Sequence, residues 1–262
     1  MACVTSGMEA MRVKLIVEYD GTNYAGWQTQ KNALTVQQCL EEALSEIAGC
    51  KISAFSSGRT DAGVHACGQT VHCDIETRIP ADKLSFVINT KLPNDIRVMH
   101  SEEASPDFHA RFSAKSKTYS YRFYVSRHTS PLLERTHYCV HVPLNITAMR
   151  IAAECFVGTH DFKAFCSADT NVKSTVRTIF ECKVLQHISA SEAAGSMDIY
   201  SIDVTGSGFL YNMVRIISGT LIDVGLGKID ACDIPGIIAS GDRCSAGVTL
   251  PPNGLCLCKV NY

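Results

Sequence analysis

The chain has 262 residues, of which 46% are hydrophobic and 19% charged, and its formal net charge is −2. These values are typical of a soluble globular protein that forms one large domain or two smaller ones. No run approaches the roughly 20 apolar residues of a membrane helix, which excludes that class of protein. Residues 1–10 have no cationic flank and no long apolar run, so they predict a loose leader rather than a secretion signal.

The 13 cysteines are scattered, and no C-x-x-C pair occurs. Cys256 and Cys258 are the closest pair, and in a strand they would share one face with Val260, as apolar filler would. Zinc sites need pairs at set spacing, so we predict no metal site. An odd cysteine count without a secretion signal indicates reduced thiols in the cytoplasm.

The first half of the chain predicts an alternation of strands and helices. Apolar residues recur at helical spacing over 35–48. Thr35 can cap this helix, Gln38 completes a capping box, and Gly49 ends it. The other elements predicted here are strands at 12–19, 69–75 and 95–100, a turn at 20–23, and a helix at 81–90.

The second half repeats this alternation. In a strand predicted over 117–125, Tyr119, Tyr121, Phe123 and Val125 would face one way. The other elements predicted are helices at 146–156 and 209–224, a short helix capped by Asp230 and ending at Gly241, strands at 176–188, 197–205 and 255–261, and a loop at 189–196.

Long antiparallel strands with a few interleaved helices indicate the α+β class rather than doubly wound α/β. Because the two halves share this layout, we predict two similar α+β subdomains, 11–105 and 106–262. The composition changes between them, near the Ser-Glu-Glu-Ala-Ser-Pro stretch.

The most informative stretch, GRTDAGVHACG, begins at Gly58. Asp61 lies beside Arg59 and between Gly58 and Gly63. Glycine permits positive φ and the close approach of another molecule, so a carboxylate here is placed to meet a substrate. A neighbouring guanidinium favours the ionised carboxylate. From composition alone, an Asp in an ordinary tight turn is the alternative.

A local excess of basic residues follows further along the chain. Between Phe108 and Arg135 the only acid is Glu134. The basic residues are Arg111, Lys115, Lys117, Arg122, Arg127 and Arg135. Such an excess can follow phosphates although the whole chain is slightly acidic. A solvated basic strand pair is the alternative.

Cofactor motifs are incomplete. Gly206-Ser207-Gly208 imitates a dinucleotide fingerprint, but the third glycine is replaced by Tyr211. Neither a P-loop nor a nucleophile elbow is present. We therefore predict an enzyme without nucleotide, metal or redox cofactor, in which one carboxylate works with cationic and aromatic partners.

Seven segments, in order, resemble the TruA-type tRNA pseudouridine synthases. They are YDGT with YAGWQ at 19–28, GRTDAGVHA with GQ at 58–69, LPNDI at 92–96, FHARFSA at 108–114, GTHDF at 158–162, GFLYNMVR at 208–215 and AGVT at 246–249. One departure is visible, because the family usually has Pro and Ala where this chain has Val248 and Leu250. These positions lie away from the Asp61 loop in the sequence.

The resemblance implies a pseudouridine synthase fold, in which antiparallel sheets of two α+β subdomains meet at a central catalytic cleft. The implied reaction isomerises uridine in RNA without a cofactor: the N-glycosidic bond breaks, the base rotates, and base C5 bonds to ribose C1′. The implied targets are uridines 38 to 40 of the tRNA anticodon stem–loop. A homodimer is also implied, with one tRNA reaching across both subunits and with neither a membrane nor DNA as partner.

The resemblance also implies residue roles. Asp61 matches the catalytic aspartate, and its attack on the sugar, attack on the base and action as a general base all stay open. Arg59 would help to expel the base, Tyr119 would stack on it, and Arg215 would pair with Asp61. A surface arginine, core packing and a snorkelling arginine are the respective alternatives. Phosphate contacts are expected from Arg111, Lys115, Lys117 and the His160 region.

Two other functions stay open at this point. One is an RNA-binding protein that kept the fold without catalysis, for which Asp61 would be unnecessary. The other is a glycoside-type hydrolase, which normally needs two carboxyl groups across the bond. No second acid accompanies Asp61 in its motif.

Overall fold

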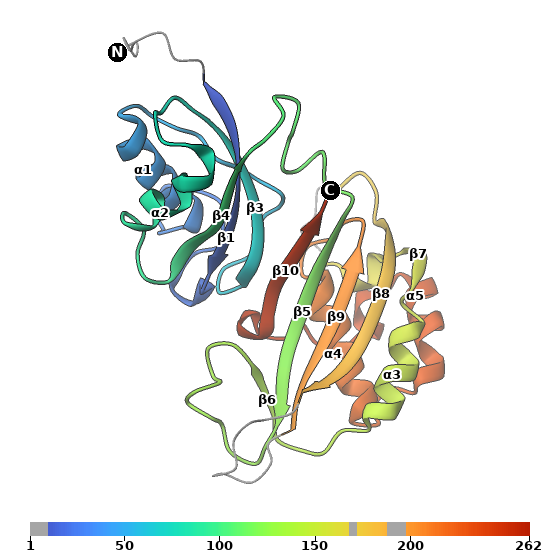
Figure 1. Cartoon of the computed structure of the whole chain (residues 1–262). Helices are drawn as coiled ribbons and strands as arrows, with labels where there is room; N and C mark the ends of the chain where they lie inside the picture. Colours follow the sequence, from blue (N-terminus) through green and yellow to red (C-terminus); the bar gives the residue numbers. More distant parts are fainter. Residues whose placement is uncertain (1–9, 168–171, 188–197) are drawn as a thin grey trace. The chain divides into compact units, whose positions relative to one another are not determined.

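The computed structural model describes residues 10–167, 172–187 and 198–262, which form two compact units (Figure 1). The first unit extends to Lys115 and also contains Leu257–Tyr262; the second is Ser116–Cys256. Apart from Ala10, the predicted leader lies outside the described residues, as does the predicted loop at 189–196.

The first unit is a sheet with helices on one face (Figure 1). Its elements are β1 (Met11–Tyr19), α1 (Val36–Ala48), β2 (Phe55–Ser56), β3 (His65–Ile75), α2 (Leu84–Asn89), β4 (Ile96–Glu103) and β10 (Leu255–Asn261) from its third residue on. The strand order is β4-β1-β3-β10, with β2 on β3. β1 is antiparallel to both β3 and β4. Its inward side chains Val13, Leu15 and Val17 are fully buried.

Helix α1 begins and ends as its sequence predicts. The Thr35 side chain accepts from the Gln38 N–H, and Gly49 closes the helix in the left-handed conformation (φ 68°). The Gln38 side chain does not close the predicted capping box, because its amide donates to Glu42 at 2.9 Å. The buried face of the helix begins at Val36 and includes Leu40 and Leu44.

The second unit has the same layout, a sheet with helices on one face (Figure 1). Its elements are β5 (Ser116–Val125), β6 (Tyr138–Val140), α3 (Ile146–Glu154), β7 (Gly158–Asp161), β8 (Val176–His187), β9 (Asp198–Gly206), α4 (Met213–Gly225) and α5 (Ile234–Ser240). Within this unit the order is β5-β9-β8-β7, all antiparallel. The short strand β6 pairs with β5 in parallel. The α+β class is thus confirmed.

The division between the units differs from the predicted boundary at 105. The segment 105–115 lies in the first unit because its backbone and side chains bond to that sheet, as when Lys115 N donates to Asn261 O at 2.8 Å. The last residues of the chain join the same unit because β10 lies beside β3.

Two predicted helices begin differently in the structure. The helix predicted from 209 starts at Met213, because Asn212 has φ 61° and cannot continue a right-handed helix. The helix predicted at 81–90 is a 3-10 turn followed by α2. On β5, Ser120 and Tyr124 are buried as well, so both faces of that strand are covered. No helix within the described residues is long and apolar enough to cross a membrane.

Candidate active site

Asp61 is half-buried in the loop between β2 and β3 of the first unit. Its neighbour Thr60 is held through both its backbone carbonyl and its side-chain hydroxyl. The Thr60 carbonyl accepts from Trp27 N at 3.0 Å, and its hydroxyl bonds to the Tyr19 hydroxyl at 2.8 Å. Tyr19 and Trp27 are both buried, so the backbone beside Asp61 is tied to the core of the unit.

Two glycines let the turn after β1 lie directly on this loop. Gly26 has φ +90°, and a Cβ there would lie 2.6 Å from the Thr60 carbonyl oxygen. A Cβ at Gly21 would lie 2.0 Å from the Val64 carbonyl oxygen. No side chain can stand at either position without moving the loop, which explains why glycine is needed there.

Buried polar groups support the same loop from β3. Gln69 is fully buried, donates to the Gly58 carbonyl at 2.8 Å and accepts from the Ser57 hydroxyl at 2.7 Å. Arg59 is exposed, and its guanidinium has no hydrogen-bond or ion-pair partner among the described residues. The loop is thus rigid at its base and carries a long cation at its surface.

In the second unit, Tyr119 occupies a fixed position on β5. It lies opposite Val204 of β9, and Phe209 meets its ring edge to face at 5.2 Å. Tyr121 follows on the same face, fully buried, and donates to the Pro251 carbonyl at 2.9 Å. Burial raises the pKa of Tyr121 above its usual value, so its hydroxyl stays protonated.

Arg215 projects from the first turn of α4 and is half-buried. Its Nε donates to the Leu250 carbonyl at 2.6 Å, and one Nη donates to Asn212 Oδ1 at 2.7 Å. The other N–H groups of the guanidinium have no hydrogen-bond or ion-pair partner within the part of the chain that the structure describes. Arg215 is therefore an oriented cation with donors left for an anion.

The sequence did not single out Asn212, yet it organises this corner. It is the one non-glycine residue with positive φ among those described, and its amide donates to Ser167 Oγ at 2.9 Å. Asn tolerates this conformation better than most residues, so an asparagine inside the predicted helix 209–224 was the available signal. Leu250 stands at one of the two positions where the sequence departs from the family pattern. It contacts Arg215 through its backbone carbonyl, so the change of side chain does not alter this bond.

The structure keeps Lys117 near Tyr119 and separates His160 from it. Lys117 lies two residues earlier on β5, opposite Gly206 of β9. His160 lies on β7, three strands away in the sheet order, or about 14 Å. Its Nε2 lies 3.0 Å from the Val157 carbonyl. His160 thus belongs to the sheet edge rather than to the Tyr119 corner.

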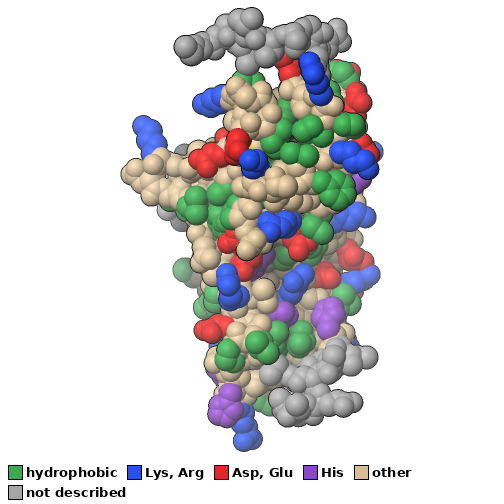
Figure 2. All heavy atoms as spheres, turned by 60° about the vertical axis from the view of Figure 1, so that its left-hand side comes forward, with side chains coloured by type: hydrophobic (Ala, Val, Ile, Leu, Met, Phe, Trp, Pro, Cys, Tyr) green, Lys and Arg blue, Asp and Glu red, His purple; other side chains and the backbone are tan. Residues whose placement is uncertain are grey.

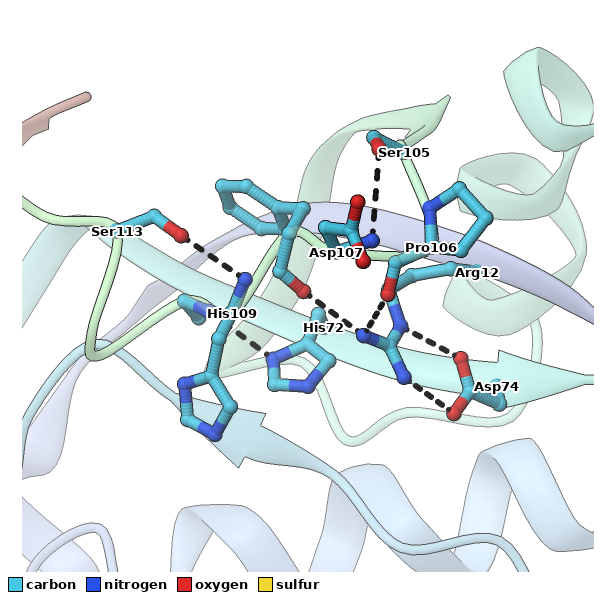
Figure 3. Close-up of polar contacts among 10 residues, drawn as sticks. Arg12, His72, Asp74, Ser105, Pro106, Asp107, His109 and Ser113 are labelled. Carbon is cyan, nitrogen blue, oxygen red and sulfur yellow. Dashed lines mark hydrogen bonds and ion pairs between the residues drawn. The ribbon is translucent and has the colours of Figure 1, made fainter.

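Arg111 lies on the 105–113 turn of the first unit, which Arg12 ties to the sheet (Figure 3). Arg12 donates to Asp74 through two nitrogens, each at 2.8 Å. It also donates to two carbonyl oxygens of the turn, at 2.5 and 3.0 Å. The ion pair with Arg12 holds the pKa of Asp74 below its usual range, so this anchor is charged at neutral pH.

Two histidines hold the tip of this turn. His72 Nδ1 accepts from Ala110 N at 3.1 Å. His109 Nδ1 accepts from the backbone N–H groups of Arg111 and Phe112, at 3.1 and 3.4 Å. An imidazolium carries hydrogen on both nitrogens and cannot accept, so the bond from Ala110 requires the His72 ring to be neutral. Burial lowers the pKa of His72, and His109 and Arg12 lower it further.

The charges on the surface are mixed. On the face drawn in Figure 2, Lys and Arg side chains are interspersed with Asp and Glu rather than gathered into one block. This agrees with the formal net charge of −2. Any contact with a polyanion on this face therefore relies on individual residues more than on a broad basic field.

One group of thiols could share a soft metal ion. Cys67, Cys256 and Cys258 occur where β10 runs beside β3, and the Cys67 thiol lies 3.7 Å from the Cys258 carbonyl. They offer three ligands, whereas structural zinc sites use four. The absence of a bound metal stays a prediction. All the described cysteines are free thiols.

The family model and the curated relatives that match this chain all describe tRNA pseudouridine synthases. The family model for tRNA pseudouridine synthase matches residues 15–113 and 152–262. A protein of Ruminiclostridium cellulolyticum named tRNA pseudouridine synthase A is 47% identical, over 96% of this chain and 99% of its own. Relatives with the same name in Acetivibrio thermocellus and Geotalea daltonii are 46% and 44% identical, each over 95% of this chain and 99% of their own.

These matches identify the class as RNA-modifying isomerases. The chain belongs to the tRNA pseudouridine synthase family.

The packing of Gly26 on the Asp61 loop is tested by Gly26→Ala. We expect a loss of about 3 kcal/mol in the free energy of unfolding, because Ala is strained at this φ and its Cβ collides with Thr60. Gly49→Ala is the matched control: φ is also positive, but nothing lies within 4 Å, so about 1 kcal/mol is expected. Equal losses in urea denaturation would contradict the close approach.

The neutral state of His72 predicts a pH dependence. In the unfolded chain this group binds a proton near pH 6.5, whereas its folded-state pKa is lower. Its contribution to stability is therefore full above about pH 6.5 and is lost as the pH falls through that value toward the folded-state pKa.

The variant His72→Asn retains an acceptor oxygen for Ala110 N but does not titrate. Its free energy of unfolding should fall less between about pH 7.5 and 5 than that of the wild type. His128→Asn, at an exposed histidine, should keep the wild-type slope. The interpretation is wrong if His72→Asn keeps that slope as well.

Proposed function

We propose that this protein isomerises uridine to pseudouridine in tRNA, at positions 38 to 40 of the anticodon stem–loop. The observation that carries this proposal is Asp61, on a backbone-locked loop, in a chain 47% identical to a tRNA pseudouridine synthase A. The anticodon positions rest on the family resemblance.

The reaction needs a carboxylate but no co-substrate. The bond from base N1 to ribose C1′ breaks, a bond from base C5 to C1′ forms, C5 loses its proton and N1 gains one. Asp61 is the group that we assign to this exchange, and carboxylates are an established class of covalent catalyst. The rigid base of the loop would hold the carboxylate in one place while the base rotates.

We assign Arg215 as the cation that pairs with Asp61. A half-buried guanidinium needs an anionic partner, and Arg215 has N–H groups left for one after bonding Leu250 and Asn212. Such a pair would keep the carboxylate ionised and oriented.

The remaining roles concern the RNA. Removing a base from its stack costs a few kcal/mol, which a stacking ring can offset. Tyr119, braced by Phe209, is the ring that we assign to the target base. Arg59 is exposed, and its planar guanidinium can stack on bases and pair with phosphates, as a residue that helps to expel the base should. Arg111 and Lys117 would meet phosphates, with His160 contacting a separate part of the RNA.

The assembly and location follow the same reasoning. We propose a homodimer in which one tRNA reaches across both subunits, on the resemblance alone, and light scattering would measure it. A cytoplasmic location is proposed from the reduced cysteines.

The catalytic assignment predicts the behaviour of Asp61→Ala. With tRNA carrying 5-tritiated uridine, the wild type should release tritium, because C5 loses its hydrogen when the new bond forms. Asp61→Ala should release none, while its affinity for tRNA stays within about threefold of wild type, since one side chain on a supported loop is lost.

Two other outcomes would overturn the proposal. Tritium release by neither protein, with tRNA binding intact, would indicate an RNA-binding protein. Free uracil among the products would indicate a glycoside hydrolase instead. Mapping the pseudouridines then tests positions 38 to 40 separately.

The orientation of Arg215 by Asn212 predicts that stability and turnover respond differently. Gly adopts the left-handed conformation freely, so Asn212→Gly should leave the free energy of unfolding within about 1 kcal/mol of wild type. Its kcat should fall about tenfold, because the guanidinium loses a charge-assisted hydrogen bond.

Asn212→Ala is the comparison, since it loses the same bonds but keeps the backbone strain. It should match Asn212→Gly in kcat and be less stable. A wild-type kcat for both variants would show that Asn212 does not act through Arg215.

A further inference from the structure

Phe112 is exposed without being on a loose segment. It is 77% exposed at the tip of the 105–113 turn. That turn is anchored by Arg12, by the two histidine acceptors and by Tyr262, which donates to the Ala110 carbonyl at 2.7 Å. A single exposed apolar ring is ordinary on a protein surface, but exposed apolar groups that lie together commonly mark a contact with a partner.

Phe112 is the end of a short row of rings, the aromatic row, which consists of Phe55, His109 and Phe112. The ring centres of His109 and Phe112 are 4.3 Å apart, and those of Phe55 and His109 are 6.1 Å apart. Phe55, from β2, is 50% exposed and stacks on the buried His72 ring at 5.1 Å. The row therefore offers two exposed phenylalanine rings with an imidazole between them.

The charges beside the row favour an anionic partner. The Arg111 guanidinium lies 5.7 Å from the centre of the Phe112 ring. Lys115 is exposed a few residues further on, and the chain from Phe108 to Lys115 contains no acid. A purely apolar protein surface would not need these cations, whereas a nucleotide presents both a flat base and a phosphate.

We propose that the aromatic row is a stacking platform for an unpaired nucleotide of the RNA substrate, with Arg111 at its phosphate. This rests on the proposed function, since RNA is the ligand. It adds a site for a base other than the one assigned to Tyr119. Stacking on aromatic rings is tolerant of sequence, because every base has a flat face.

The test compares tRNA affinity among variants of Phe112 at one fixed salt concentration, with an unmodified tRNA transcript as the probe. Phe112→Ala should bind about five- to a hundredfold more weakly, the range for losing one stacked base. Phe112→Leu should be as weak, since it is apolar but not flat, and Phe112→Trp should bind as the wild type does.

Phe86 provides a matched control in the same unit. It is 69% exposed, and the Lys83 ammonium lies 5.9 Å from its ring centre, so it shares exposure and a neighbouring cation with Phe112. Phe86→Ala should leave tRNA affinity unchanged. Arg111→Ala should lower the salt dependence of binding by about one phosphate contact.

Fluorescence gives a direct readout of stacking. The one native tryptophan, Trp27, is 2% exposed, so an indole introduced by Phe112→Trp would dominate any change on binding. tRNA should quench that indole and leave one introduced by Phe86→Trp unaffected.

Three outcomes would overturn the platform. Full affinity in Phe112→Leu would show that apolar contact suffices, and full affinity in Phe112→Ala would show that the ring does not touch RNA. A change of oligomeric state in Phe112→Ala, measured by light scattering, would make the row a protein interface. A wild type that binds tRNA but makes no pseudouridine would contradict the proposed function while leaving these comparisons valid.

Discussion

The close approach of two backbones underlies the candidate active site. The turn after β1 lies on the Asp61 loop so tightly that a single methyl group at Gly21 or Gly26 would overlap a carbonyl oxygen. Backbone contact of this kind fixes position better than side-chain packing, because neither partner has a side-chain torsion to adjust. The buried Gln69 then satisfies the loop carbonyl at Gly58 that this packing takes from water. The loop can present a carboxylate because its backbone is held at Gly58 and Thr60, on the same side of Asp61.

The second unit holds the Arg215 guanidinium in a different way. Arg215 is held at two nitrogens, by a backbone carbonyl and by an asparagine in the left-handed conformation. Strain of this kind persists only where the surroundings support it, and here the Asn212 amide also bonds to Ser167. The half-buried guanidinium is thereby oriented before any anion arrives, which lowers the cost of pairing.

The sequence predicted what depends on local chemistry. Thr35 and Gly49 bound α1 because caps are set by adjacent residues. Glycines around Asp61 indicated a tight loop, and the motif set indicated the family. The predicted start of α4 was wrong. The apolar residues from Phe209 onward fit a helical pattern, but the left-handed conformation of Asn212 prevents the helix from starting before Met213. The unit boundary depended on β10 returning to β3 and on Arg12 binding a turn far along the chain, and no local pattern reports such contacts.

On the face drawn in Figure 2, recognition of a polyanion has to be local. The net charge of the chain is −2 and that face mixes both signs, so long-range attraction supplies little binding energy there. Specific cations, oriented rings and a rigid framework must supply it instead. The 105–113 turn meets that requirement because the acceptor nitrogens of His72 and His109 hold its backbone, while the His109 ring lies 4.3 Å from the exposed Phe112 ring and 6.1 Å from the exposed Phe55 ring. The bond to His72 also makes the turn sensitive to acid, because a protonated His72 ring can no longer accept the Ala110 N–H.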